Sequence, residues 1–294
     1  MTDTELAALV ATATDLPAPV AAALAHPEPG RERTVEAAGH AWRAIDWGDA
    51  ADPPGLLVHG GTSNAETFWR VGPAIAAAGR HVLAVDLPGH GGTGGWRGRH
   101  RFAETATDLA AFIRTAGLDR PGLAVLGHSW GGMVVAALPA AGLRPDRLVL
   151  LDPPVLDLEA LEEMTRDPLE RPYRTLQAAV AAVEAANPGW SGGDVRAKAL
   201  GLTQFDPDAV LAVLLENGDW DGGLAALADP AAAGIRTWLI RGVPEAGGLV
   251  PDAALAGFGA RIGRDNVVTI AGAPHSPQRT HPEATVRAIL RAIA

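Results

Sequence analysis

One serine in this chain stands in a pattern that suits nucleophilic attack. The segment GHSWG at residues 127–131 places Ser129 between two glycines, after an apolar run typical of a buried strand and before a helical pattern. A Gly-x-Ser-x-Gly sequence at such a strand-to-helix turn holds the serine on a sharp, strained bend with its hydroxyl exposed to substrate. An ordinary glycine-rich turn is the alternative interpretation, but this context favours a nucleophile at Ser129.

A serine hydroxyl is a poor nucleophile unless a base takes its proton. The chain has nine histidines, and His275 is the one that follows the last predicted strand and precedes the last predicted helix. From that position an imidazole can reach the turn that follows a central strand, within the hydrogen-bonding distance that proton transfer needs. We therefore predict that His275 is the general base.

Acyl transfer also needs two N–H donors aimed at the oxygen that becomes negatively charged. The backbone N–H of Trp130, directly after the serine, is the first candidate. The segment HGGTSN at residues 59–64 ends an earlier apolar run and supplies the second, with Gly61 as the donor and Thr62 as an assisting group. A plain glycine turn is the alternative for this segment, but two glycine turns converging on one sheet edge favour an oxyanion hole.

Histidines and tryptophans near these turns are candidates for the wall of a substrate pocket. His59 lies in a glycine loop at a strand end, and His128 lies inside the serine turn, where such a residue more often packs than reacts. The chain has eight tryptophans against one tyrosine, and each tryptophan is more often a core residue than a ligand contact. Trp130, Trp190 and Trp220 are further candidates. The predicted substrate-binding residues are His59, Thr62, His128 and Trp69.

These residues need a scaffold of strands and helices that alternate along the chain. Apolar strands followed by helices predict an α/β fold with a mostly parallel central sheet and helices on both faces. Ligands of such sheets bind beyond the carboxyl ends of the strands, which is where every candidate above lies. The alternation lapses over residues 155–230, which are acidic and helical, and residues 1–30 form an alanine-rich N-terminal extension interrupted by prolines.

The motifs VHGG, DLPGHGGT, GHSWGG and GAPH…HPE resemble those of the α/β-hydrolase family in order and approximate spacing. The resemblance covers about residues 50–150 and 235–294. It implies a core whose first part is residues 1–154 and whose second part is residues 231–294. It also implies that residues 155–230 are a helical cap inserted after the sixth strand.

The resemblance leaves two positions open for the acid that orients the histidine. The family usually carries this acid after the seventh strand, where Glu245 stands three residues after Gly242. Related hydrolases place it after the sixth strand, where Asp152 follows an apolar run. Asp152 could instead cap the turn at the two following prolines, and Glu245 could be a solvated loop carboxylate. We therefore expect the acid to be Asp152 or Glu245.

The amino-acid composition limits the classes of molecule that the protein is expected to bind. The formal net charge of −10 argues against nucleic acid and anionic membranes, and the absence of cysteine excludes thiolate metal sites. No HExxH or phosphate-binding loop is present, so neither a metal nor an organic cofactor is expected. The N-terminal segment lacks the basic flank of a signal peptide, and no apolar run reaches transmembrane length, so a cytoplasmic protein is expected.

Together these observations predict a carboxylic ester hydrolase with a small-molecule substrate. We expect it to cleave an ester or lactone of small to medium size and largely apolar character through an acyl-enzyme. The same scaffold and triad also support a cofactor-free lyase or perhydrolase. A non-catalytic ligand-binding member of the family is the third alternative.

Overall fold

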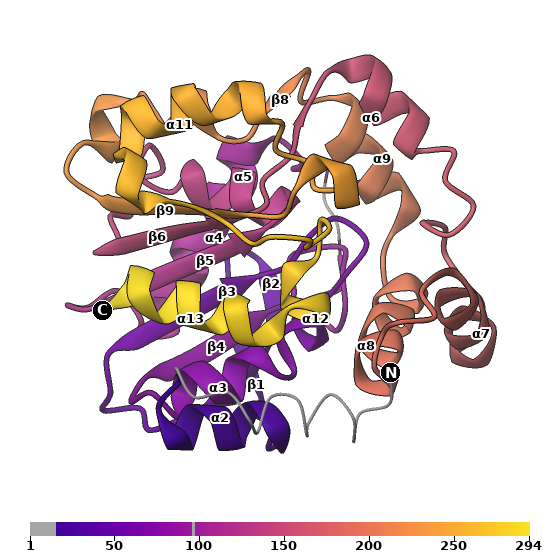
Figure 1. Cartoon of the computed structure of the whole chain (residues 1–294), viewed down its shortest axis with the longest axis horizontal. Helices are drawn as coiled ribbons and strands as arrows, with labels where there is room; N and C mark the ends of the chain where they lie inside the picture. The colour runs from indigo at the N-terminus through magenta and orange to yellow at the C-terminus, as the bar shows by residue number, and fades with distance from the viewer. Residues whose placement is uncertain (1–15, 96–97) are drawn as a thin grey trace.

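The computed structural model describes residues 16–95 and 98–294, which fold around one eight-stranded sheet (Figure 1). The strand order across the sheet is β1-β2-β4-β3-β5-β6-β9-β10. These strands are β1 (Arg31–Ala37), β2 (His40–Trp47), β3 (Pro54–Val58), β4 (His81–Val85), β5 (Ala124–His128), β6 (Arg147–Leu151), β9 (Arg236–Arg241) and β10 (Val267–Thr269).

The sheet is parallel from β4 to β10, and β2 runs antiparallel to both of its neighbours, β1 and β4. Strands β1 and β2 form a hairpin whose turn residues Ala38 and Gly39 both have positive φ, at 49° and 77°. This is the geometry of the tight turns that join two antiparallel strands with right-handed twist. The prediction of a mostly parallel α/β sheet is confirmed.

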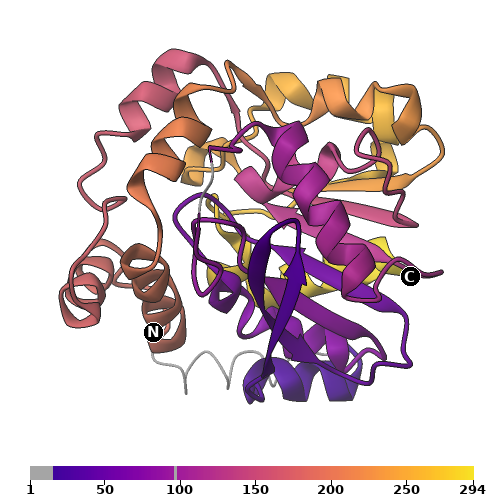
Figure 2. The same ribbon diagram turned by 180° about the vertical axis from the view of Figure 1, so that it is seen from behind.

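Helices cover both faces of the sheet because each central strand is apolar on both sides. On β3, Leu56 and Val58 point into one apolar cluster with helices α4 (Phe102–Thr115), α5 (Trp130–Ala136) and α11 (Leu255–Ile262). Leu57 points into a second cluster on the opposite face, with α2 (Ala18–Ala25), α3 (Val71–Ala76) and α13 (Pro282–Ile293). Figure 2 shows α4, in magenta, in front of the face opposite to the one that the yellow α13 covers in Figure 1.

A helical insertion separates β6 from β9. It contains α6 (Leu158–Met164), α7 (Leu176–Ala186), α8 (Gly192–Thr203), α9 (Pro207–Leu215) and α10 (Leu224–Leu227), with the short antiparallel pair β7 (Val155–Leu156) and β8 (Trp220–Asp221). Helices α7 and α8 pack around an apolar cluster of their own. In Figure 1 they stand beside the sheet rather than on either face of it.

Short helical turns complete the described chain. They are α12 (Pro277–Thr280), η1 (Ala65–Phe68), η2 (Pro230–Ala232), η3 (Pro244–Ala246), η4 (Asp252–Ala254) and η5 (Arg264–Asn266). Of the predicted N-terminal extension, residues 1–15 lie outside the described residues, and the remainder includes α2, which packs against α3 and α13. No helix in the described part of the chain has the length and apolar character needed to cross a membrane.

Candidate active site

Ser129 lies at the junction between β5 and α5 in a conformation that few residues other than glycine adopt. Its φ is 55° and its ψ is −127°, which is a strained region for a side chain with a Cβ. The glycines of the motif permit the bend. A Cβ at Gly131 would lie 2.5 Å from the carbonyl oxygen of His59 and 2.6 Å from that of Val58, and a Cβ at Gly127 would clash with the Gly131 carbonyl.

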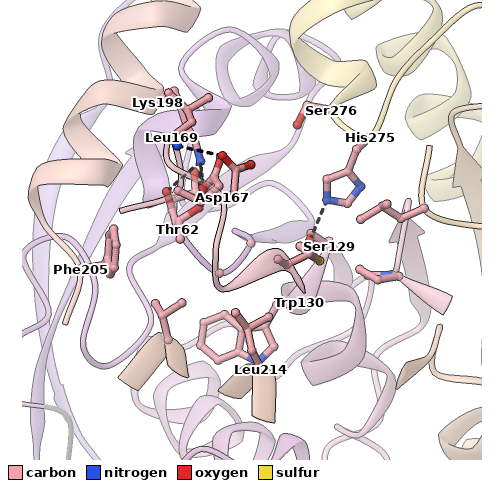
Figure 3. A pocket seen from close by; sticks show the side chains of 18 of the residues that line it. Thr62, Ser129, Trp130, Asp167, Leu169, Lys198, Phe205, Leu214, His275 and Ser276 are labelled. Carbon is pink, nitrogen blue, oxygen red and sulfur yellow. Dashed lines mark hydrogen bonds and ion pairs between the residues drawn. The ribbon is translucent and has the colours of Figure 1, made fainter. Parts of the chain in front are cut away.

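His275 connects this serine to a buried carboxylate. It lies on the loop between β10 and α12, with its Nε2 2.9 Å from the Ser129 Oγ (Figure 3). Its Nδ1 lies 2.7 Å from the Asp152 Oδ2. A carboxylate accepts from Nδ1–H, which leaves Nε2 to accept from the serine hydroxyl. The three side chains thus form one hydrogen-bonded path along which a proton can leave Ser129.

Asp152 is held at the ends of two strands, β6 and β9, and by the loop that follows β9. It follows β6, its side chain is fully buried, and its own N–H donates to Ile240 at the neighbouring β9, at 2.8 Å. Its Oδ1 accepts from the Gly242 N–H at 3.0 Å, and its Oδ2 accepts from the Leu249 N–H at 2.9 Å. These donors fix the orientation of the carboxylate toward His275.

Glu245, the other carboxylate that the sequence left open, has none of these contacts. It lies exposed in η3. Within residues 16–95 and 98–294, the carboxylate that hydrogen-bonds to His275 is that of Asp152, and Glu245 forms no such bond. The structure therefore brings Ser129, His275 and Asp152 together and leaves Glu245 at the surface.

Gly61 and Trp130, whose backbone N–H groups are the predicted oxyanion donors, line the same cavity as Ser129. Trp130 is the first residue of α5, where backbone N–H groups have no partner within the helix. Gly60 packs so closely on Ser129 that a Cβ there would lie 2.9 Å from the serine Cβ, and Gly61 beside it borders open space. No described residue accepts a hydrogen bond from the N–H of Gly61 or of Trp130. These N–H groups therefore remain the candidate oxyanion donors.

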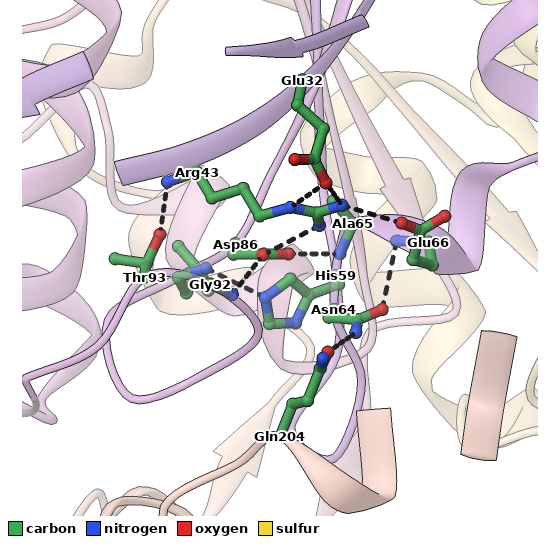
Figure 4. Close-up of polar contacts among 11 residues, drawn as sticks. Glu32, Arg43, His59, Asn64, Ala65, Glu66, Asp86, Gly92, Thr93 and Gln204 are labelled. Carbon is green, nitrogen blue, oxygen red and sulfur yellow. Dashed lines mark hydrogen bonds and ion pairs between the residues drawn. The ribbon is translucent and has the colours of Figure 1, made fainter. Parts of the chain in front are cut away.

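Buried polar contacts hold the glycine loop after β3 in place (Figure 4). The fully buried Asp86 accepts from the N–H groups of Ala65 at 2.7 Å and Gly92 at 2.8 Å, and from the Arg43 guanidinium at 3.2 Å. Asn64 donates to the Gln204 side chain at 2.8 Å, which ties this loop to the helical insertion.

His59 belongs to this support rather than to the pocket wall. It is completely buried, and its Nε2 accepts from the Leu87 N–H at 3.0 Å while its Nδ1 lies 2.8 Å from the Gly60 carbonyl. Burial, with His90 nearby, lowers the pKa of His59 to about 3. The imidazole is therefore neutral and connects two loops. This corrects the prediction that His59 lines the substrate site.

Trp69 is also displaced from the predicted site. Its Nε1 donates to the Asp194 carboxylate at 3.0 Å, and its ring packs on Gly193 at the start of α8. It fills the space between η1 and the insertion and does not line the cavity beside Ser129. The other three tryptophans that the sequence offered as pocket candidates, Trp130, Trp190 and Trp220, do line that cavity.

His128 lines the cavity and supports the loop of His275. Its Nε2 donates to the His275 carbonyl at 2.9 Å, and the two imidazole rings have centroids 4.9 Å apart. Burial, followed by the nearby His275, lowers the pKa of His128 well below its ordinary value. A neutral His128 avoids placing a second positive charge beside an imidazolium at His275.

The cavity has a volume of about 540 Å³ and lies between the carboxyl ends of the strands and the insertion. Thr62, Gly61, Ser129 and His275 form its floor. Apolar side chains of the insertion cover much of it, among them Met164, Leu169, Phe205, Val210, Leu211 and Leu214. Among the described residues, no three histidine or acidic side chains are grouped as a metal site would require.

A group of buried charges in the cavity wall was missed by the sequence reasoning. Lys198 lies in α8 with its Nζ 2.6 Å from the Glu170 carboxylate and 2.8 Å from the Thr62 hydroxyl. Arg279, in α12, is 4% exposed and also borders the cavity. A lysine within the run AKALGL at residues 197–202 is the signal that could have pointed here, but nothing in the sequence shows which helix faces the serine.

Comparisons with known proteins agree with this architecture. A solved structure of an E-2-(acetamidomethylene)succinate hydrolase superposes with a TM-score of 0.75 at 23% identity, covering 90% of this chain and 99% of that one. The structure of an esterase from Mycobacterium tuberculosis superposes with a TM-score of 0.67 at 26% identity, covering 100% of this chain and 98% of the esterase.

Similarity at the sequence level is local. A monoacylglycerol lipase of Mycolicibacterium smegmatis is 38% identical over 96 residues, which are 31% of this chain and 34% of the lipase. The chain spans about a third of the length of the curated relatives that it matches. The sequence model of the α/β hydrolase fold matches residues 53–206, which run from β3 through the serine turn into the insertion. The chain belongs to the α/β-hydrolase fold family.

Proposed function

We propose that the protein is a serine hydrolase that cleaves carboxylic esters or lactones of small to medium size through an acyl-enzyme. The observation that carries this proposal is the hydrogen-bonded path from Asp152 through His275 to Ser129, which opens on a cavity of about 540 Å³. The lipase and esterase among its relatives support it.

In the first half of the reaction, the Ser129 Oγ forms a bond to the acyl carbon and its proton moves to the His275 Nε2. The carbonyl oxygen becomes an oxyanion that the N–H groups of Gly61 and Trp130 bind. Asp152 stabilises the imidazolium and keeps Nδ1 protonated. The tetrahedral intermediate then expels the alkoxide, which takes the proton from His275.

In the second half, a water molecule attacks the acyl carbon and gives its proton to the same Nε2. The new oxyanion collapses, the acid leaves and Ser129 recovers its proton. Residues 155–230 act as the cap in this proposal. Their apolar side chains over the serine favour substrates with an apolar acyl or alcohol part, since burying apolar surface stabilises the complex by about 25 cal/mol per Å².

A fluorophosphonate probe tests the nucleophile. The wild-type protein is expected to gain one adduct, mapped by mass spectrometry to the peptide that contains Ser129, and Ser129→Ala is expected to gain none. Ser191→Ala is the matched control, because Ser191 lies outside the cavity wall, and it is expected to react like the wild type. An unlabelled wild type, or equal labelling of Ser129→Ala, would refute the proposal and favour a ligand-binding protein.

The reaction type needs a separate measurement. A panel of 4-nitrophenyl esters of increasing acyl length and a set of γ-lactones is expected to yield the free acids, identified by NMR, with activity absent in Ser129→Ala. If Ser129 reacts with the probe but no ester or lactone is hydrolysed, the hydrolase assignment is wrong. The lyase and perhydrolase alternatives are then examined by adding peroxide and by analysing carbon–carbon bond cleavage.

A further inference from the structure

The wall of the cavity opposite the serine carries buried charges that the proposed mechanism does not use. Figure 3 shows Lys198 and Thr62 on one side of the cavity, away from Ser129 and His275. Lys198 is 9% exposed, and its Nζ contacts the Glu170 carboxylate and both the hydroxyl and the carbonyl oxygen of Thr62, at 2.6, 2.8 and 3.3 Å. The Thr62 hydroxyl also donates to Glu170.

Arg279 stands beside this pair without a carboxylate of its own. Its guanidinium donates to the Asp194 carbonyl at 3.1 Å and to the Thr67 hydroxyl at 2.8 Å, and it lies over the Trp190 ring at 4.8 Å from the centroid. No carboxylate of the described residues forms an ion pair with it within 4.0 Å. Its buried Nε has no hydrogen-bond partner within the described part of the chain.

The buried charges in this region do not cancel. Among the lysine, arginine and acidic side chains that line the cavity, three cations, Arg171, Lys198 and Arg279, face two carboxylates, Asp167 and Glu170, which leaves one positive charge. The exposed Asp167 and Arg171 at the cavity rim offset each other. Burying a cation without a counter-charge is costly, and an anion that enters the site removes that cost.

The pKa shifts of Glu170 and Lys198 reflect both their burial and the ion pair between them. Burial acts to raise the pKa of Glu170, but the nearby Lys198 ammonium and its hydrogen bonds hold it below the ordinary value. Burial lowers the pKa of Lys198, and the Glu170 carboxylate opposes that shift. The Arg279 guanidinium, whose Nε–H has no partner among the described residues, therefore offers a charge-assisted donor to a ligand, and the Lys198 ammonium adds a second positive charge at the same wall.

We propose that Lys198 and Arg279 form a subsite for a carboxylate carried by the substrate, at the far end of the acyl chain from the scissile ester. A single carboxylate matches the single unbalanced charge. The apolar side chains between the two ends of the cavity suit the methylene chain that joins the ester to that carboxylate. This inference rests on the proposed function, because the ester end is placed at Ser129.

Binding to an inactive protein tests the subsite without relying on catalysis. In Ser129→Ala, monomethyl esters of the dicarboxylic acids from succinate to suberate are compared by calorimetry with the dimethyl esters of equal length. At one chain length or more, the acid is expected to bind at least tenfold more tightly, with the preference decreasing between 25 and 500 mM NaCl. Equal affinity of each pair at every length would overturn the proposal.

Variants identify the cations responsible. In the Ser129→Ala protein, Lys198→Met or Arg279→Met is expected to reduce the preference for the acid to about twofold or less. Arg196→Met removes an exposed cation from the same helix and is expected to retain the preference. Arg279→Lys keeps the charge and is expected to retain part of it. If the preference survives both Lys198→Met and Arg279→Met, the subsite is not formed by these residues.

The rate of ester hydrolysis gives a second test of the carboxylate subsite. The ratio of kcat/KM for 4-nitrophenyl hydrogen adipate to that for 4-nitrophenyl hexanoate is expected to exceed ten in the wild type. This ratio is expected to fall at least tenfold in Lys198→Met, mainly because KM for the adipate ester rises. In Arg196→Met the ratio is expected to stay unchanged. A ratio near one in the wild type would count against the subsite. If neither ester is cleaved and Ser129 resists the fluorophosphonate, the proposed function fails, and the binding experiment still decides the subsite.

Discussion

Asp152 and Glu245 differ in each contact that an orienting carboxylate needs. Asp152 is fully buried, and its carboxylate accepts hydrogen bonds from the N–H groups of Gly242 and Leu249. Its Oδ2 lies 2.7 Å from the Nδ1 of His275. Glu245 is exposed on a short helical turn. Both follow a strand in the sequence, so their chain positions alone do not separate them. The difference arises because β6 ends between β5 and β9, next to the turn that carries Ser129.

Asp152→Asn is expected to reduce kcat/KM on a 4-nitrophenyl ester by about 10³- to 10⁴-fold. An amide presents a donor to His275, which then holds its proton on Nε2 and cannot accept from Ser129. Glu245→Gln, the matched removal of the other carboxylate, is expected to stay within about twofold of the wild type. Steady-state kinetics with circular dichroism as a check of folding measures both, and full activity in Asp152→Asn would contradict the assignment.

At the scale of elements, the serine turn depends on how closely α5 approaches β3. Gly131 lies inside α5, where replacing glycine with alanine normally stabilises a helix by about 1 kcal/mol. Here the added Cβ would lie 2.5 and 2.6 Å from two carbonyl oxygens at the end of β3. Backbone atoms cannot move aside as a flexible side chain can. Close packing therefore outweighs helix propensity at this position.

Gly131→Ala is consequently expected to lower the free energy of unfolding by about 1 to 3 kcal/mol. Thermal unfolding by calorimetry is expected to show this as a reduced Tm, together with a large loss of activity because the bend at Ser129 moves. Gly189→Ala is the control, since no atom lies within 4 Å of the Cβ position at Gly189. A Gly131→Ala protein that is more stable than the wild type would show that the close approach is not limiting.

At the scale of the whole molecule, several buried histidines make stability depend on pH. Burial lowers the pKa of His59 to about 3, and it also lowers the pKa values of His90 and His128. Such a group is neutral in the folded protein, whereas the unfolded chain binds a proton below about pH 6.5. Between about pH 3 and pH 6.5 the unfolded state therefore holds more protons, and the free energy of unfolding falls as the pH falls.

For His59 this dependence is of order 1 kcal/mol per pH unit in that window. Urea unfolding of the wild type between pH 7.5 and pH 5 is expected to show decreasing stability. His59→Gln keeps an acceptor for the Leu87 N–H and is expected to flatten the profile. His26→Gln replaces an exposed histidine and is expected to leave the slope as in the wild type. An equally steep profile in His59→Gln would contradict a buried neutral imidazole.

Local patterns in the sequence determined the scaffold and part of the site. Apolar strands alternating with helices predicted the mostly parallel sheet, because strands buried on both faces must be apolar throughout. Ser129, Trp130, Gly61 and His275 were predicted from strand-end positions, and such ends meet at one edge of a parallel sheet. The structure places these residues around one cavity.

Other features depended on which segments meet in space. Asp152 was separated from Glu245 only by the order of the strands, and His59 and Trp69 were displaced from the pocket because their polar atoms bind neighbouring loops. Lys198, Glu170 and Arg279 come from segments up to 109 residues apart, and no local pattern joins them. Hydrophobic periodicity specifies which face of an element is buried, whereas the partners of a buried charge are set by tertiary packing.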